Sequence, residues 1–279
     1  MKRLAGALAA SLLPTFASAA GLEIAVHGGP VVSPYEQSVR LDPSGLVLPG
    51  GAVVPGGQAL GLEADGGTVL GGAVTLYLAG WFGIEGRLDV ADLRLLVTGA
   101  TYRVVVDLPA PLADASGDLE LGAGPMDVER IRPLSLNLKL RTPGRVRLAL
   151  SGGLSYLPEL RVISAQAVRL RSVSVPGVPA GSVLATVGLR AEAQPGVAEN
   201  GRFGANAGIG LQIALGDHLA LVGEGRGFVF REHRLDWQRA GGALAPLEQA
   251  LARELERRLD PVDFNPNFFQ VTAGLALSF

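Results

Sequence analysis

The amino-acid sequence predicts an all-β fold: an eight-stranded antiparallel barrel that crosses a membrane. The last residues, 268–279, alternate apolar side chains with small or polar ones, which is the two-residue period of a strand with two different faces. A tilted strand of this length spans the hydrocarbon layer of a bilayer. Hydrophobic residues make up 48% of the chain, yet no stretch after the N-terminus is long and apolar enough for a spanning helix. The apolar surplus must therefore be spread over many alternating strands.

The N-terminus predicts export. Lys2 and Arg3 precede an apolar stretch, 4–13, and Ala17-Ser18-Ala19 supplies the small residues of a cleavage site. A membrane-spanning helix needs about 20 apolar residues, and this stretch is shorter. We therefore expect residues 1–19 to be a signal peptide, cleaved after residue 19 or 20, and residues 20–279 to form one outer-membrane barrel domain.

Seven further segments alternate in the same way and bring the number of wall strands to eight. They are 21–29, 70–78, 82–90, 134–140, 146–155, 203–215 and 219–231. Three short turns join these strands into hairpins, and four long segments, 31–68, 92–130, 157–202 and 232–266, connect the rest. Outer-membrane barrels have short periplasmic turns and long external loops. An even strand number therefore places both chain ends on the periplasmic side.

The long segments carry further structure. Residues 101–108 and 183–193 alternate like strands, and 160–173 alternates less cleanly. These segments either extend the wall beyond the membrane or add a hairpin, which would make ten strands. We favour eight, because a wall strand at 160–173 would turn Ser164 and Gln166 toward lipid.

One helix is expected in the last long segment, at about 245–259. Leucines recur there every four residues, and Pro246 suits the first helical turn. The leucine stripe is expected to pack on the barrel rim; binding to a partner or to the membrane surface is the alternative.

Charged residues on the predicted inward faces are balanced in sign. An eight-stranded barrel is only wide enough to be filled by side chains, so we expect these charges to pair across the lumen and plug it. The expected ion-pair network consists of Glu23, His27, Glu85, Arg87, Asp89, Lys139, Arg147, Glu224 and Arg226. The alternative is an ion or proton path, or an acid–base site around His27 with Glu85 or Glu224. A filled lumen, however, leaves no cleft for a substrate.

Composition argues against other classes of function. The chain has no cysteine, and its three histidines, His27, His218 and His233, show no metal-ligand spacing, so neither a metal nor a cofactor is expected. There is no nucleophile elbow and no phosphate-binding loop. The formal charge of −2 becomes −4 once the two positive charges of Lys2 and Arg3 are removed, and neither value suggests a nucleic-acid partner. A non-enzymatic protein is expected.

The signal peptide, the amphipathic strands and the terminal Phe279 resemble the small outer-membrane β-barrels of Gram-negative-type bacteria, of the OmpA, OmpX and OmpW kind. The resemblance implies that the last strand, with Leu275, Leu277 and Phe279, is recognised by the barrel-assembly machinery. It implies outer-membrane lipid and lipopolysaccharide as surroundings, and a role in envelope integrity or in surface interactions through the loops. Aromatic residues at the wall edges are expected to be Trp81, Phe82, Tyr156, Phe203 and Phe269.

The same resemblance offers alternatives. An OmpW-like barrel would be a narrow transporter for small apolar molecules, which requires an apolar lumen. Some barrels modify lipid A with a serine–histidine pair; Ser155 is the candidate serine here, but the wall histidine, His27, is expected to face inward. Acidic loop residues could bridge lipopolysaccharide phosphates through divalent cations, although such residues are more often simply solvated. These residues are Asp114, Asp118 and Glu120.

Overall fold

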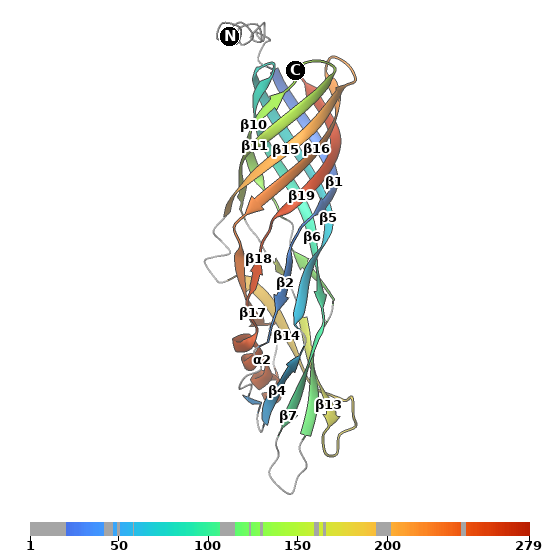
Figure 1. The fold of residues 1–279 in the computed structure, drawn as a ribbon, viewed down its shortest axis with the longest axis vertical. Coiled ribbons are helices and arrows are strands. Elements are labelled where there is room, and N and C mark those ends of the chain that lie inside the picture. Colours follow the sequence, from blue (N-terminus) through green and yellow to red (C-terminus); the bar gives the residue numbers. More distant parts are fainter. Residues whose placement is uncertain are drawn as a thin grey trace, which may run out of the picture.

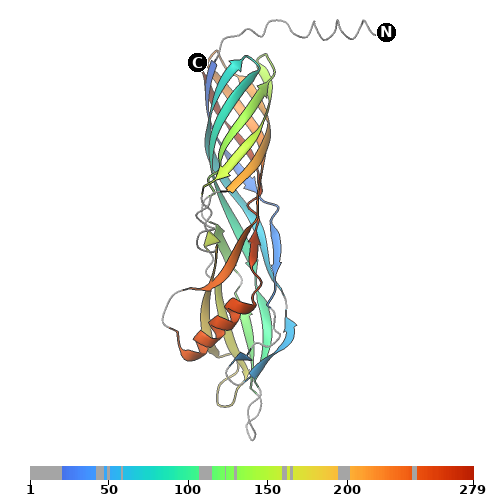
Figure 2. The ribbon, with the colours of Figure 1, turned by 90° about the vertical axis from the view of Figure 1, so that its left-hand side faces the viewer.

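The protein has a closed barrel at one end and a second β unit at the other (Figures 1 and 2). The computed structural model describes residues 21–41, 47–48, 51–57, 59–106, 115–122, 124–128, 131–158, 162–163, 166–193, 202–240 and 244–279. The expected signal peptide, 1–19, lies outside the described residues. Among the helical residues described, no helix is long and apolar enough to cross a membrane.

Eight antiparallel strands form the barrel wall, and all eight expected strands are confirmed. In ring order they are β1 (Gly21–Val32), β5 (Leu60–Ala79), β6 (Phe82–Thr98), β10 (Leu134–Arg141), β11 (Val146–Leu157), β15 (Arg202–Ala214), β16 (Leu219–Phe230) and β19 (Phe268–Ser278). The ring closes because β19 pairs back onto β1, with Leu277 opposite Ile24. Closure leaves the wall without a free edge, so every wall strand has a hydrogen-bonding neighbour on both sides. The ten-strand alternative is therefore wrong.

The two faces of the wall differ as the alternation predicts. Apolar side chains project outward and are exposed, as Ile24, Leu136 and Leu221 illustrate. The polar partners in the same strands are buried inside the ring, as Glu23 and Asn137 illustrate. An apolar exterior around a polar interior is the pattern of a wall that faces lipid.

The short turns and the C-terminus lie at the same end of the barrel (Figure 1). Gly144 adopts a φ of +112° in the turn between β10 and β11, a conformation that other residues rarely adopt. Trp81 and Phe82 lie at this end with ring centroids 5.8 Å apart, and Tyr156 and Phe203 form a 5.0 Å pair at the other end. Aromatic residues therefore lie at both wall edges, where a barrel meets the membrane interfaces.

The long segments fold together into one unit, which we call the extension. β5 and β6 continue into it beyond the barrel, and β5 bulges at Gly66, whose φ is +75°. Strands β2 (Glu36–Val39), β9 (Gly124–Val128) and β12 (Val162–Ile163) flank them in the order β2-β5-β6-β9-β12. The extension therefore begins as a direct continuation of two wall strands.

A second sheet completes the extension. In order it contains β18 (Val262–Phe264), β17 (His233–Arg239), β14 (Val183–Ala193), β13 (Gln166–Ser174), β8 (Ala115–Leu121), β7 (Ala100–Val106), β4 (Gly51–Gly57) and β3 (Val47–Leu48). The expected strand 183–193 coincides with β14, 101–108 corresponds to β7, and 160–173 is divided between β12 and β13. Leu62 and Val97 from the first sheet and Leu119 and Val187 from the second belong to one buried hydrophobic core. The loops are thus a folded β unit with a core of its own.

The expected helix is α2 (Pro246–Arg258), and it packs on the extension rather than on the barrel rim. Leu251 and Leu255 are fully buried against the core, and the helix contacts β14, β17 and β3. Glu248 and Glu256 accept hydrogen bonds from the backbone N–H groups of Thr186 (3.2 Å) and Arg239 (2.6 Å). Two strand N–H groups that would otherwise face solvent are thereby satisfied by the helix.

Candidate functional site

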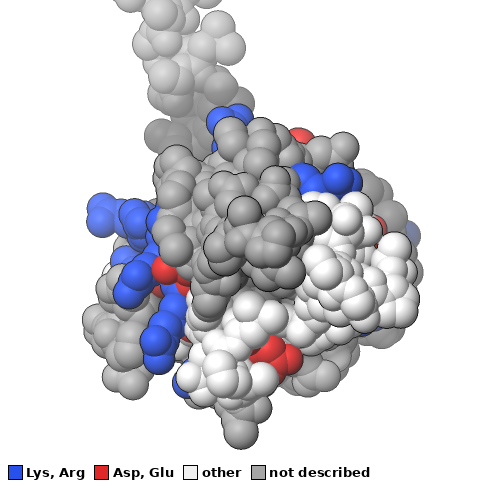
Figure 3. All heavy atoms as spheres, turned by 90° about the horizontal axis from the view of Figure 1, so that it is seen from below, with Lys and Arg blue, Asp and Glu red and all other residues white. Residues whose placement is uncertain are grey.

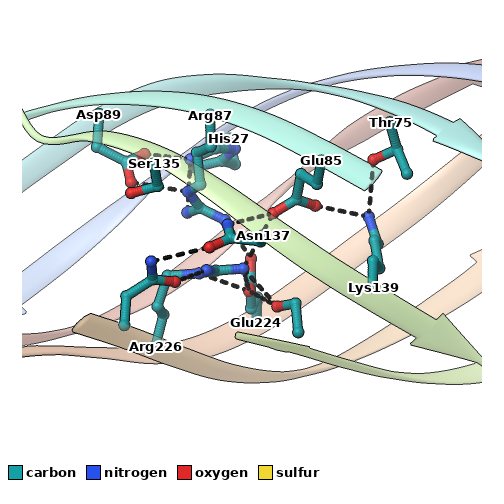
Figure 4. A network of polar contacts seen from close by, with 12 residues as sticks. His27, Thr75, Glu85, Arg87, Asp89, Ser135, Asn137, Lys139, Glu224 and Arg226 are labelled. Carbon is teal, nitrogen blue, oxygen red and sulfur yellow. Dashed lines mark hydrogen bonds and ion pairs between the residues drawn. The ribbon is translucent and has the colours of Figure 1, made fainter. Parts of the chain in front are cut away.

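The barrel lumen contains the largest group of buried charged residues among those the structure describes, and Figure 4 shows its central part. Alternation along the wall strands turns these side chains inward, and antiparallel pairing brings strands that are distant in the sequence together around them. The network runs along the barrel from the short-turn end toward the extension.

At the short-turn end, Glu23 is surrounded by donors. Lys139 Nζ lies 3.2 Å from Glu23 Oε1, and Arg141 Nη1 lies 3.3 Å from Oε2. Gln212 Nε2 donates to Oε2 at 2.8 Å. The Arg141 guanidinium also lies over the ring of Tyr77, 3.5 Å from its centroid, a cation–π contact. Every oxygen of this buried carboxylate is therefore satisfied.

In the middle of the lumen, Arg226 connects two acidic side chains. Its Nη2 lies 3.1 Å from Oε1 of Glu85 and 2.6 Å from Oε1 of Glu224. Nη1 donates to Asn206 Oδ1, and the whole side chain is fully buried. Glu85 Oε2 also lies 3.0 Å from Lys139 Nζ, and this ion pair connects the Arg226 cluster to the cluster around Glu23. A guanidinium with its planar set of donors suits such a multiply bonded interior position.

A third cluster lies nearest the extension. Arg87 Nη1 is 2.5 Å from Glu224 Oε2, and Arg87 Nε is 2.7 Å from Asp89 Oδ2. Asp89 Oδ1 also lies 2.7 Å from His27 Nε2, and the same nitrogen lies 2.8 Å from Arg87 Nη2. One ring nitrogen can either donate to the carboxylate or accept from the guanidinium, so the His27 tautomer decides which bond forms.

Neutral polar side chains fill the space between the charges. Asn137 donates to Glu85 at 3.1 Å, and Asn206 donates to both Asn137 and Ser155 at 2.8 Å. The hydroxyls of Ser135 and Ser155 are 2.8 Å apart. Ser155 is therefore engaged with amide and hydroxyl partners, and the wall histidine, His27, lies in the Asp89 cluster instead.

An apolar layer follows the polar network toward the extension. The rings of Phe228 and Phe268 stack with centroids 4.5 Å apart, and both side chains are buried. Val31, Val69 and Leu157 join them in the same hydrophobic cluster as the extension core. Near the short-turn end, a cavity of only about 40 Å³ lies beside Lys139, Ser151 and Gln212, among other residues. A space of this size holds a few water molecules at most.

The structure brings eight of the nine residues expected in the network into mutual contact. They are Glu23, His27, Glu85, Arg87, Asp89, Lys139, Glu224 and Arg226. Arg147 is the exception: it sits at the start of β11 beside the turn, and its Nε donates to Gly144 O at 2.8 Å. Arg141 takes its place, which keeps four acidic and four basic side chains in the lumen. Its position two residues after Lys139, on the same strand face, is the sequence signal that could have identified it.

The other candidate residues lie elsewhere. Asp118 pairs with Arg103 at 2.5 Å and Glu120 with Arg171 at 2.7 Å on the outer face of the second sheet, while Asp114 lies outside the described residues. Leu275, Leu277 and Phe279 form an exposed outward row at the end of the chain. In the described ranges, no group of three or more histidine, aspartate or glutamate side chains is arranged to hold a metal ion.

A closed eight-stranded ring with an apolar exterior and a charged, filled interior defines the chain as an integral outer-membrane β-barrel protein. No family model matches the sequence, and no curated protein matches it. Among solved structures, it is similar to the outer membrane protein OprG from Pseudomonas aeruginosa, at 16% identity over 94% of this chain and 96% of that one, with a TM-score of 0.43.

Two further solved structures show more distant similarity. One is Ail, the attachment invasion locus protein of Yersinia pestis, at 9% identity over 94% of this chain and all of that one (TM-score 0.33). That structure contains a heparin analogue. The other is the outer membrane protease OmpT from Escherichia coli, at 8% identity over 95% of this chain and all of that one (TM-score 0.39).

Proposed function

We propose that this protein is a non-enzymatic barrel with a plugged lumen, and that its role in envelope structure or in surface interaction is carried by the extension. The observation that carries the proposal is the continuous chain of ion pairs across and along the lumen. It runs from Arg141 through Glu23, Lys139 and Glu85 to Arg226, and on through Glu224 and Arg87 to Asp89.

The network supports a plug because separating its members is costly. A buried charge that loses its partner retains the full penalty of leaving water, so removing one partner typically costs about 3–5 kcal/mol. A solute passing through the lumen would have to separate several such pairs at once, including those of Arg226. It would then meet the stacked Phe228 and Phe268. Both layers favour a closed interior.

The extension supports a role at the surface. It is folded around a core, and the outer face of its second sheet carries Arg103, Arg169 and Arg171 between two acidic side chains. Seen from the end far from the barrel, arginine side chains gather along one side of the described surface (Figure 3). A rigid, arginine-bearing unit held at the membrane by a barrel is suited to contact with anionic groups.

The alternatives receive less support from the lumen. A transporter for small apolar molecules needs an apolar passage, whereas charged side chains such as Arg226 and Asp89 fill this one. A lipid A-modifying enzyme would need a serine and a histidine together near the membrane edge. Ser155 is instead bonded to Ser135 and Asn206.

Planar-bilayer conductance of the refolded full-length protein tests the proposal. We expect no large, stable channel from the natural sequence, nor from Arg147→Ala, which alters a residue outside the network. Lys139→Ala should admit transient openings, because it removes the contact between Glu23 and Glu85. Large and stable channels in the natural protein would contradict the plugged lumen.

A further inference from the structure

The lipid-facing side of the barrel has a groove that is separate from the lumen. It crosses β5, β6, β10, β11 and β15 and has a volume of about 670 Å³. Its outward-facing lining is apolar, with Val74, Leu88, Leu136 and Leu154 around it. Arg87 also lines the groove, but its side chain is buried in the lumen, so only its backbone can face outward.

Two glycines form the floor of this groove. Gly86 lies between Val74 and Leu136 in the strand pairing, and a Cβ added to it would meet no heavy atom within 4 Å. A Cβ at Gly72 would come no closer than 3.4 Å to its nearest neighbour, an ordinary contact. By contrast, a Cβ on the inward-facing Gly71 would approach Asp89 Oδ1 to 2.1 Å. Packing thus requires glycine at position 71 but not at 72 or 86, where the absence of side chains leaves the groove open.

The groove lies in the membrane leaflet next to the extension. One end is closed by the ring pair of Tyr156 and Phe203, 5.0 Å apart. Tyr156 is the second-last residue of β11, and Phe203 is the second residue of β15, both at the barrel end from which long segments depart. Tyrosine at such a position has an apolar ring in the hydrocarbon and a hydroxyl at headgroup level.

We propose that this groove binds one acyl chain of a membrane lipid, with the headgroup beside Tyr156. Five neighbouring strands span roughly 19 Å at about 4.8 Å per strand spacing. This distance runs across the strands, and because wall strands tilt by about 35–45°, about 11–14 Å of it lies along the membrane normal, which fits within the half of a roughly 30 Å hydrocarbon core that one leaflet fills. Lipid and leucine are equally apolar, so selective binding comes from packing in the groove rather than from burial. A chain over Gly86 is contacted from below and from both sides.

Photocrosslinking tests the site in the full-length protein. The protein is refolded in phosphatidylcholine vesicles that contain a small fraction of phosphatidylcholine with a diazirine on its acyl chain. After irradiation, adducts are mapped on two tryptic peptides: 148–161, which contains Leu154 and Tyr156, and 259–279, which covers β19 on the opposite wall. We expect about fivefold more adduct on 148–161, the excess that a few additional carbon contacts provide. Equal yields on both peptides in the natural protein would overturn the proposal.

Variants separate groove binding from general contact with lipid. Gly86→Leu fills the groove and should reduce the excess on 148–161 to the level of 259–279, and Gly72→Leu is a second variant with the same expectation. Ala273→Leu is the matched control, because it adds the same side chain to an exposed outward position on β19. It should leave the excess on 148–161 unchanged. An excess that persists in both glycine variants would also overturn the proposal.

Discussion

Arg226 of β16 and Glu85 of β6 meet across the centre of the barrel, with Nη2 and Oε1 3.1 Å apart. The two strands stand on opposite sides of the ring, with three strands between them in either direction. This single ion pair therefore bridges the full width of the lumen. It shows that the interior is narrow enough for side chains from opposite walls to bond directly.

Arg226→Leu should destabilise the barrel by about 3–5 kcal/mol, because it leaves Glu85 and Glu224 without one of their cationic partners in a buried site. Urea unfolding in vesicles and heat-modifiable gel migration measure the effect. The control is Arg147→Leu, at a partly exposed position by the turn, which should change stability by less than about 0.5 kcal/mol. If the two variants behave alike, the lumen network does not stabilise the barrel.

Lys139 should react slowly with amine-directed acylating reagents while the barrel is folded. The chain contains two lysines, Lys2 and Lys139, so the modification can be assigned without ambiguity by mass spectrometry. The Lys139 side chain is 14% exposed and is paired with both Glu23 and Glu85. Unfolded protein provides the reference rate. Acylation of the folded barrel at that same rate would show an open, water-filled lumen.

The extension should lose stability as the pH falls from about 6.5 to about 4. Burial and the charge of nearby Arg202 lower the pKa of His233 from 6.5 to about 4. In this range the unfolded chain binds a proton at His233 and the folded chain does not, so acid favours unfolding. The pKa difference corresponds to a loss of up to about 3 kcal/mol.

The pH dependence can be measured by chemical denaturation at a series of pH values. His233→Leu should remove this part of the dependence. His218→Gln, at an exposed turn, should retain it. A His233→Leu variant whose stability falls with acid as steeply as that of the natural protein would refute the assignment.

Leu255→Ala should destabilise the extension by about 2–5 kcal/mol and leave the barrel folded. Leu255 is fully buried between α2 and the sheet, so the truncation creates a cavity in the extension core. Proteolysis of the extension, followed beside heat-modifiable migration of the barrel, distinguishes the two parts. Arg257→Ala, on the exposed side of α2, is the control. Simultaneous loss of both parts would show that barrel and extension unfold as one unit.

Phe279→Ala should lower the amount of barrel assembled in cells and have little effect on refolding in vesicles. The expectation follows from the resemblance of the terminal strand to assembly signals. In the structure, the Phe279 residue is 70% exposed, while its backbone pairs with Leu22. The side chain is thus available to a partner and contributes little to packing. The matched control is Phe269→Ala, at another outward position of β19; equal assembly of the two variants would contradict the prediction.

The wall strands could be predicted from the sequence because lipid imposes a simple rule on each of them. Residues such as Leu136 and Asn137 must alternate wherever one face meets hydrocarbon and the other a polar lumen. The residues that face the lumen could be predicted from the same alternation. There are two exceptions. Alternation from Lys139 does place Arg141 in the lumen, whereas the guanidinium of Arg147 bonds to Gly144 O beside the turn and does not enter the lumen network.

The extension could not be derived in the same way. Only the segments 101–108, 160–173 and 183–193 show strand-like alternation in the sequence. The pairing joins β13 to β8 and β17 to β18 over long sequence separations. No local pattern specifies such partners, since the hydrophobic core that selects them forms only when all the segments assemble. For the same reason, the position of α2 on β14 rather than on the barrel rim was not predictable.

The sequence by itself determined that this chain is an outer-membrane barrel and favoured eight wall strands, because the lipid bilayer acts on every wall residue independently. Closure of the ring in the tertiary structure excluded ten. Only the tertiary structure decided which charges meet. Glu85 and Arg226 are 141 residues apart, and their contact depends on the closure of the ring. It also decided that Gly86 lies on the floor of a groove, because a groove is a property of neighbouring strands and not of one segment.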